Sequence, residues 1–100
     1  MSEKERMINK TEKLTLIEGK FLHEEARDIL MNIFSGKISF HQLKNFSSQE
    51  RFGKDDETAK KRIPELQKEV QKLQEILAEA KAGNKKLIIT SEINIALSND

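Results

Sequence analysis

The residues of this sequence that could perform chemistry begin with two histidines. His23 is followed by two carboxylates, Glu24 and Glu25, which is the composition of a metal or general-base cluster. A zinc-protease helix needs a second histidine four residues after the first, and position 27 is arginine. His41 has no carboxylate or nucleophile placed beside it by spacing. We therefore expect the carboxylates to favour a helix N-terminus and His41 to lie at a surface or boundary, with no catalytic or metal site at either place.

An acidic triplet and four isolated glycines provide no better candidate for chemistry. Residues 55–57 are Asp-Asp-Glu, without the alternating ligands and distal glutamate of a calcium loop, so helix N-capping accounts for them. The glycines stand apart along the chain and form no phosphate-binding loop. Because cysteine and tyrosine are absent, the candidate nucleophiles are serine and lysine, and no base partner is evident. The sequence predicts a protein that is not an enzyme and binds no metal or cofactor.

The stretch from residue 37 to residue 62 carries a local positive charge. It holds seven lysines and arginines against four carboxylates, with Phe40, Phe46 and Phe52 interleaved. Phosphate-binding faces combine cations with aromatic rings that stack on bases, although phenylalanine at helical spacing is more often core. Nucleic-acid binding through this stretch is therefore the competing functional hypothesis. The residues of the candidate basic face are Lys37, His41, Lys44, Arg51, Lys54, Lys60, Lys61 and Arg62.

A run of apolar residues at heptad spacing is the clearest structural signal in the chain. The gaps between them alternate between four and three residues, and nearly every residue in between is charged or glutamine. This pattern predicts a long helix that buries one narrow seam against another helix. We call this set the α-seam; it consists of Ala59, Ile63, Leu66, Val70, Leu73, Leu77 and Ala80.

The flanks of the α-seam restrict what can pack on it. In a parallel dimer the facing flank pairs would be Arg62–Gln67, Glu69–Gln74 and Ile76–Lys81, and none of these is an ion pair. A parallel zipper is therefore poorly specified. An intramolecular helical hairpin or an antiparallel dimer fits the pattern better, and the sequence leaves these two alternatives open.

Three shorter segments are expected before the long helix. Residues 14–17 alternate and are followed by Gly19, which predicts a short strand. Apolar residues from Leu22 to Phe34 share one helical face, and Gly36 is placed to end that helix. Ser39 and Gln42 then form a capping-box pattern that predicts a separate short helix over 40–46, with a further turn ending at residue 53.

The long helix and a final strand complete the expected fold. Asp55 and Asp56 should open the helix, and Gly83-Asn84 should end it. Pro64 either kinks this helix or marks its start near residue 63, because proline cannot donate to the preceding turn. Residues 87–97 alternate with period two, and Ser91 alone interrupts the apolar row. This pattern predicts one strand, or two strands with a bulge near Ser91-Glu92, that pairs with the first strand, most simply antiparallel.

Composition bounds the class of protein. Of 100 residues, 36% are hydrophobic and 35% charged, with a net charge of +1, so the core is thin and the chain suits helices that share burial with a partner. We expect a helix-dominated α+β fold with a flexible arm over residues 1–12 and a single domain over 13–98. No membrane span or signal peptide is evident, so a cytoplasmic protein is expected. The predicted function is a small non-enzymatic interaction module that forms a homodimer or binds a protein partner, without membrane contact.

Overall fold

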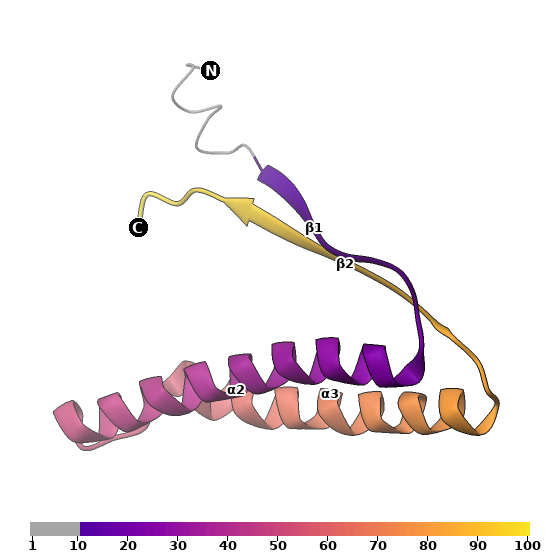
Figure 1. Cartoon of the computed structure of the whole chain (residues 1–100). Coiled ribbons are helices and arrows are strands. Elements are labelled where there is room, and N and C mark those ends of the chain that lie inside the picture. Colours follow the sequence, from indigo (N-terminus) through magenta and orange to yellow (C-terminus); the bar gives the residue numbers. More distant parts are fainter. Residues whose placement is uncertain (1–10) are drawn as a thin grey trace, which may run out of the picture. The chain divides into compact units, whose positions relative to one another are not determined.

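The computed structural model describes residues 11–100 and contains two strands and two helices (Figure 1). They follow in the order β1 (Thr11–Phe21), α2 (His23–Phe52), α3 (Glu57–Ala82) and β2 (Leu87–Ala96). The two strands pair antiparallel in one two-stranded sheet. The predicted α+β class, with the first and last strands paired, is therefore confirmed. Contacts divide the chain into a strand unit, formed by the two terminal segments up to Lys20 and from Ile88, and a helical unit over Phe21–Leu87.

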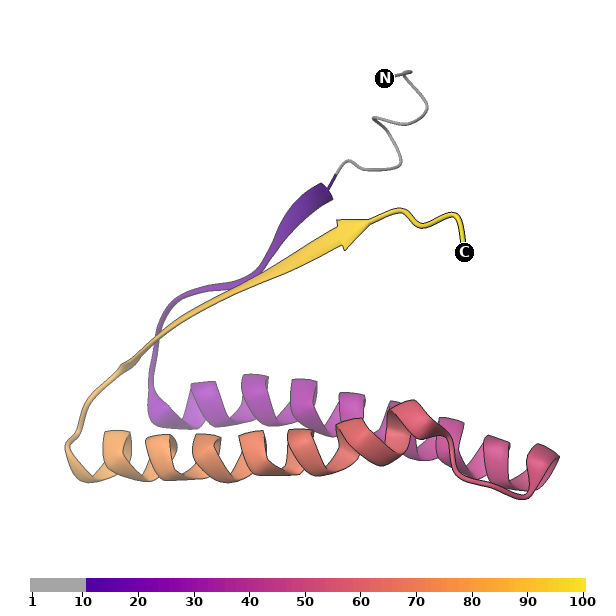
Figure 2. The same cartoon turned by 180° about the vertical axis from the view of Figure 1, so that it is seen from behind.

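The helical unit is an antiparallel hairpin in which α2 and α3 lie side by side along their length (Figures 1 and 2). Gly53 ends α2 in the left-handed conformation, with φ of 68°, and its N–H donates to the Gln49 carbonyl at 2.9 Å. Asp56 caps α3, because its Oδ2 accepts from the Ala59 N–H at 2.9 Å. The Asp56 N–H in turn donates to Oδ1 of Asn45 at 2.8 Å, which ties the start of α3 to the last turns of α2.

The prediction that Gly36 and Ser39 interrupt the first helix is wrong, because α2 runs without a break from His23 to Phe52. Glycine inside a helix costs about 1 kcal/mol relative to alanine, and a serine cap needs a free helix start. Packing against α3 outweighs both local signals, because contacts with α3 stabilise a continuous α2 more than the glycine and the serine destabilise it. The separate helix expected over 40–46 and the separate turn after it are both parts of α2.

Helix α3 has the bounds expected from its caps and includes Pro64 in its interior. Of the two alternatives for this proline, a start near residue 63 is wrong, because the helix begins at Glu57. Proline has no N–H to donate to the Lys60 carbonyl, which costs α3 one hydrogen bond of its ladder. At the other end Gly83 donates its N–H to the Glu79 carbonyl at 2.9 Å, and Asn84 takes a positive φ of 50°.

In the strand unit, the first strand is longer than the sequence predicted. β1 begins at Thr11 and not at residue 14, whereas β2 starts at Leu87 as expected. The arm predicted over residues 1–12 lies outside the described residues except for Thr11 and Glu12, which belong to β1. The single domain expected over 13–98 stays a prediction.

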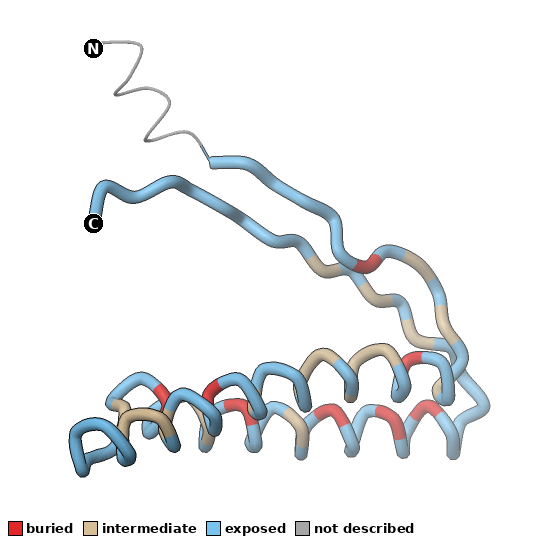
Figure 3. The backbone as a smooth tube through the Cα atoms, turned by 60° about the vertical axis from the view of Figure 1, so that its left-hand side comes forward, coloured by how far each residue is buried: buried red, intermediate tan, exposed pale blue. Residues whose placement is uncertain are grey.

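Burial is concentrated on the facing sides of the two helices (Figure 3). Among the described residues, the buried positions of the helical unit are Ala26 and His41 on α2 and five residues of α3. In the strand unit, Ile17 alone among residues 11–20 and 88–100 is buried, at 8% exposure. The described core of the helical unit is therefore a narrow seam between two helices.

Candidate interaction surfaces

The α-seam lies at the packed side of α3. Ala59, Leu66, Leu73, Leu77 and Ala80 are buried, and the two remaining members of the set are half-buried. Because α2 packs along α3, the chain itself supplies a helix for this seam, which is the intramolecular alternative of the sequence analysis. The neighbouring Ile76 is 51% exposed and does not belong to the packed side.

The packed side of α2 becomes polar in the half that leads to the hairpin turn. The side chains near its start are apolar: Ala26 is fully buried, and Leu30 and Ile33 are half-buried. Toward the turn the packed positions after Ile38 are His41 and Asn45, of which His41 is only 6% exposed. Both ring nitrogens of His41 are buried, and neither has a hydrogen-bond partner among residues 11–100. His41 is therefore a buried polar residue of the helix pair, and not the surface or boundary residue expected from the sequence.

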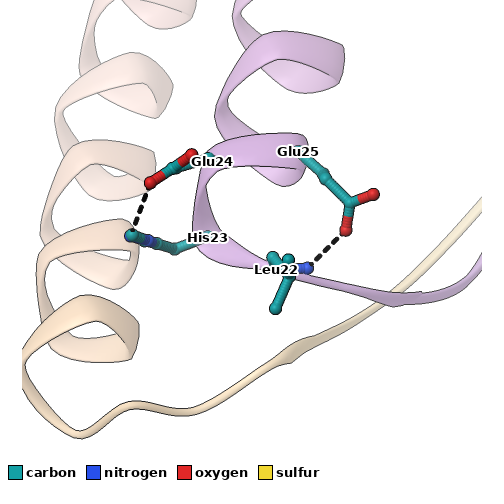
Figure 4. Close-up of polar contacts among 4 residues, drawn as sticks. All are labelled: Leu22, His23, Glu24 and Glu25. Atoms are coloured by element: carbon teal, nitrogen blue, oxygen red, sulfur yellow. Dashed lines mark hydrogen bonds and ion pairs between the residues drawn. The ribbon is translucent and has the colours of Figure 1, made fainter.

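The start of α2 forms a small polar corner (Figure 4). Oε1 of Glu25 accepts from the Leu22 N–H at 2.9 Å and so satisfies one free backbone donor at the helix start. Nε2 of His23 lies 3.9 Å from Oε1 of Glu24, which is too long for a hydrogen bond. These carboxylates thus act at the helix N-terminus, as expected. The adjoining cavity of about 230 Å³ is shared with the end of α3, and its lining holds no serine, threonine or cysteine.

The residues of the predicted basic face do not form one exposed patch. His41 is buried, and Nη1 of Arg62 pairs with Oε2 of Glu65 at 3.1 Å. The depression lined by Lys61 and Arg62 also contains Glu57 and Glu65, so its charges balance. Lys60 is exposed elsewhere on α3, and Lys54 is exposed in the connection after α2. Lys37, Lys44 and Arg51 remain as an exposed set on α2.

A second heptad pattern on α2 was not recognised in the sequence. Gly36, Phe40, Leu43 and Ser47 are spaced four, three and four residues apart, and we call them the outer stripe. Phe40 is 52% exposed and Leu43 69% exposed, so the stripe lies away from the packed side of α2. The spacing was present in the sequence, but the break predicted at Gly36 and Ser39 concealed it.

The strand unit also presents apolar side chains. On β1, Leu14 and Leu16 are 51% and 49% exposed, and they share one face because side chains of a strand alternate. On β2, Ile93 and Ile95 share a face and are 39% and 45% exposed, and Leu97 directly after the strand is 66% exposed. We call these two sets the strand rows.

The described residues show neither a metal site nor a membrane-spanning helix. Residues 11–100 contain no group of three or more histidine, cysteine, aspartate or glutamate residues that could hold a metal ion. Within the same residues, neither helix has the length and apolar character needed to span a bilayer. A scan against models of protein families, a search of curated proteins and a search of solved structures each return no match to this chain.

Proposed function

We propose that this protein is a small non-enzymatic interaction module that homodimerises through its strand unit. The observation that supports the proposal most is the exposure of the strand rows. They place five large aliphatic side chains in contact with water on a sheet that has two strands within residues 11–100. An isolated two-stranded sheet is marginal in water, and contiguous exposed apolar surface marks an interaction site.

A second copy of the chain is the occupant that best fits this surface. Within residues 11–100 each strand of the sheet pairs with the other on one side only, so in this part of the chain β1 and β2 each have one edge without a partner strand. A two-fold contact lets the same edge or the same face of two copies pair with itself, which extends the sheet or stacks it. Face-to-face stacking buries strand rows from both copies, whereas edge-to-edge pairing covers only the side chains next to the shared edge. Both arrangements bring together the three or more strands that independent stability requires.

A non-enzymatic role is supported by the chemistry of the described surface. The two histidines lie in or beside the helix pair, without a serine, threonine or cysteine in the cavity next to His23 and, within residues 11–100, without a hydrogen-bond partner for His41. The notable exposed features are instead apolar: the strand rows on the sheet and the outer stripe on α2. Such surfaces act by binding other surfaces, because burial of apolar area drives association.

The proposal is tested by placing a charge in one strand row. Ile95→Lys should raise the dimer dissociation constant by at least about tenfold, because an unpaired ammonium in an apolar contact costs more than 1.4 kcal/mol. Light scattering after size-exclusion chromatography, over a range of protein concentrations, measures this change. Asn94→Lys is the matched control: it adds the same charge at the next residue, on the other face of β2, and should leave the mass unchanged.

Circular dichroism at 222 nm keeps the outcome interpretable. If Ile95→Lys gives a monomer whose helical signal and helix melting are retained, the strand row forms the dimer contact. A dimer of unchanged stability in both variants would show that the strand rows are not the interface, and the proposal would be abandoned.

A further inference from the structure

The outer stripe of α2 is an apolar surface that lies outside the packed contact of the helical hairpin. Phe40 and Leu43 are more than half exposed, and Phe46 beside them is 60% exposed. The packed side of α2 is occupied by Ile38, His41 and Asn45, which lie on the opposite side of the helix from Leu43. Nothing in the helical hairpin therefore explains why three large apolar side chains stand in this position.

Gly36, at the N-terminal end of the outer stripe, is equally unexplained by the hairpin. It weakens the middle of a helix, yet a Cβ atom added at this position would meet no atom within 4 Å beyond its chain neighbours and the backbone of its own helix. The fold thus has room for a larger residue that would also favour the helix. A second helix crossing α2 at this point would explain the glycine, because a residue without a Cβ atom permits close approach of two backbones.

A row of positive charge borders the outer stripe on one side. Lys37, Lys44 and Arg51 are seven residues apart and so occupy one line along the helix. The Nζ atoms of Lys37 and Lys44 lie 5.9 Å and 5.6 Å from the centre of the Phe40 ring, one from each neighbouring turn. Within residues 11–100 these three cations form no ion pair with a carboxylate. The other flank of the stripe carries the uncharged Ser39 and Gln42.

This one-sided charge disfavours a second copy of the chain as the occupant. In an antiparallel two-fold pair of α2 helices, equal flanks face each other, so the two basic rows would repel. In a parallel pair each basic row would face the uncharged flank and gain no partner. The heptad spacing of the stripe and the glycine within it suit a packed helix better than a lipid surface, because a helix has regularly spaced side chains that insert between those of α2 and a lipid surface has none.

We propose that the outer stripe and its basic row dock an amphipathic helix of another protein, whose apolar stripe is bordered by glutamate or aspartate at seven-residue intervals. The helical hairpin and this helix form a three-helix contact, in which Phe40 and Leu43 insert between side chains of the incoming helix. Lys37, Lys44 and Arg51 pair with its acidic row, and the backbones approach most closely at Gly36.

A synthetic helix provides the probe for this site. The peptide has three heptads with leucine at the a and d positions and glutamate at every e and g position, so that it can bind in either direction. A second peptide carries lysine in place of glutamate. Fluorescence anisotropy with the full chain should show saturable binding of the glutamate peptide, at least tenfold tighter than binding of the lysine peptide at low salt. Binding of the glutamate peptide should weaken in high salt.

Three variants connect the binding to the named residues. Leu43→Ala should weaken binding at least tenfold and leave the melting temperature nearly unchanged, because Leu43 is 69% exposed in the free protein. Lys44→Glu should lose the glutamate peptide and gain the lysine peptide, which a merely structural lysine would not do. Gly36→Ala should raise the melting temperature by several degrees and still weaken binding, whereas Ser35→Ala, on the uncharged flank, should leave binding unchanged.

Several binding results would contradict an acidic helix as the occupant of the outer stripe. Equal binding of both peptides, or no binding of the glutamate peptide up to 1 mM, excludes an acidic helix as the occupant. Preferential binding of vesicles with 30% phosphatidylglycerol assigns the stripe to a membrane surface instead, and preferential binding of a mixed-sequence DNA duplex assigns it to nucleic acid. This site does not depend on dimerisation, so a monomeric strand variant such as Ile95→Lys should bind the peptide as well as the original chain.

Discussion

Replacing Leu73 with alanine is expected to lower the free energy of unfolding of the helical unit by about 2–5 kcal/mol. Leu73 lies in the middle of α3 and is only 7% exposed, so the substitution removes a large buried side chain and leaves a cavity between two helices. In a domain of this size the melting temperature should fall by about 10 °C or more. Thermal unfolding followed by circular dichroism at 222 nm measures the change.

Two substitutions on the same helix serve as controls for Leu73. Gln71→Ala lies on the exposed side of α3 and should have almost no effect. Ile76→Ala removes a side chain of the same size, but Ile76 is 51% exposed, so the loss should be well below that of the Leu73 variant. Equal and small effects of all three substitutions would mean that the α-seam is not packed, and the account of the helical unit would be wrong.

The second large effect on stability is expected from a larger side chain at the buried residue Ala26. Ala26 on α2 has 0% exposure, so Ala26→Leu places three additional carbon atoms at a position without contact with solvent. Such overpacking forces side chains or backbone to shift and costs about 1–3 kcal/mol. Urea unfolding should therefore show a lower midpoint with an unchanged slope, because the surface exposed on unfolding stays the same.

Ala78→Leu is the matched substitution for this test, since Ala78 lies on the exposed side of α3. Its midpoint should stay within the error of the unsubstituted protein, because both residues are good helix formers. If Ala26→Leu were as harmless as Ala78→Leu, the close approach of the two helices at Ala26 would be incorrect.

The sequence predicted α3 and β2 well because several local signals agree there. In α3 the heptad spacing, the Asp56 cap and the Gly83-Asn84 stop all indicate the same helix, and the structure has it from Glu57 to Ala82. In β2 the period-two alternation holds from Leu87 onward, and the structure has one strand through the interruption at Ser91. Where local signals and tertiary packing agree, a helix or strand can be predicted from a single sequence.

The sequence failed for α2 because local signals and packing disagree there. Gly36 and Ser39 have the chemistry of a helix end and a helix start, yet both lie inside one continuous helix. This error also concealed the surfaces of the helix. The outer stripe becomes visible only when Gly36, Phe40 and Leu43 belong to the same helix. The burial of His41 follows from its position three residues after Ile38, which a sequence divided into two helices does not show.

Sedimentation equilibrium of the unmodified chain tests the proposed function most directly. The chain has a mass of 11.5 kDa, so a homodimer built through the strand unit should give about twice that value at high micromolar concentration and should dissociate on dilution. A mass of 11.5 kDa at every concentration up to several hundred micromolar would show that the strand rows need no second copy, and homodimerisation would be refuted.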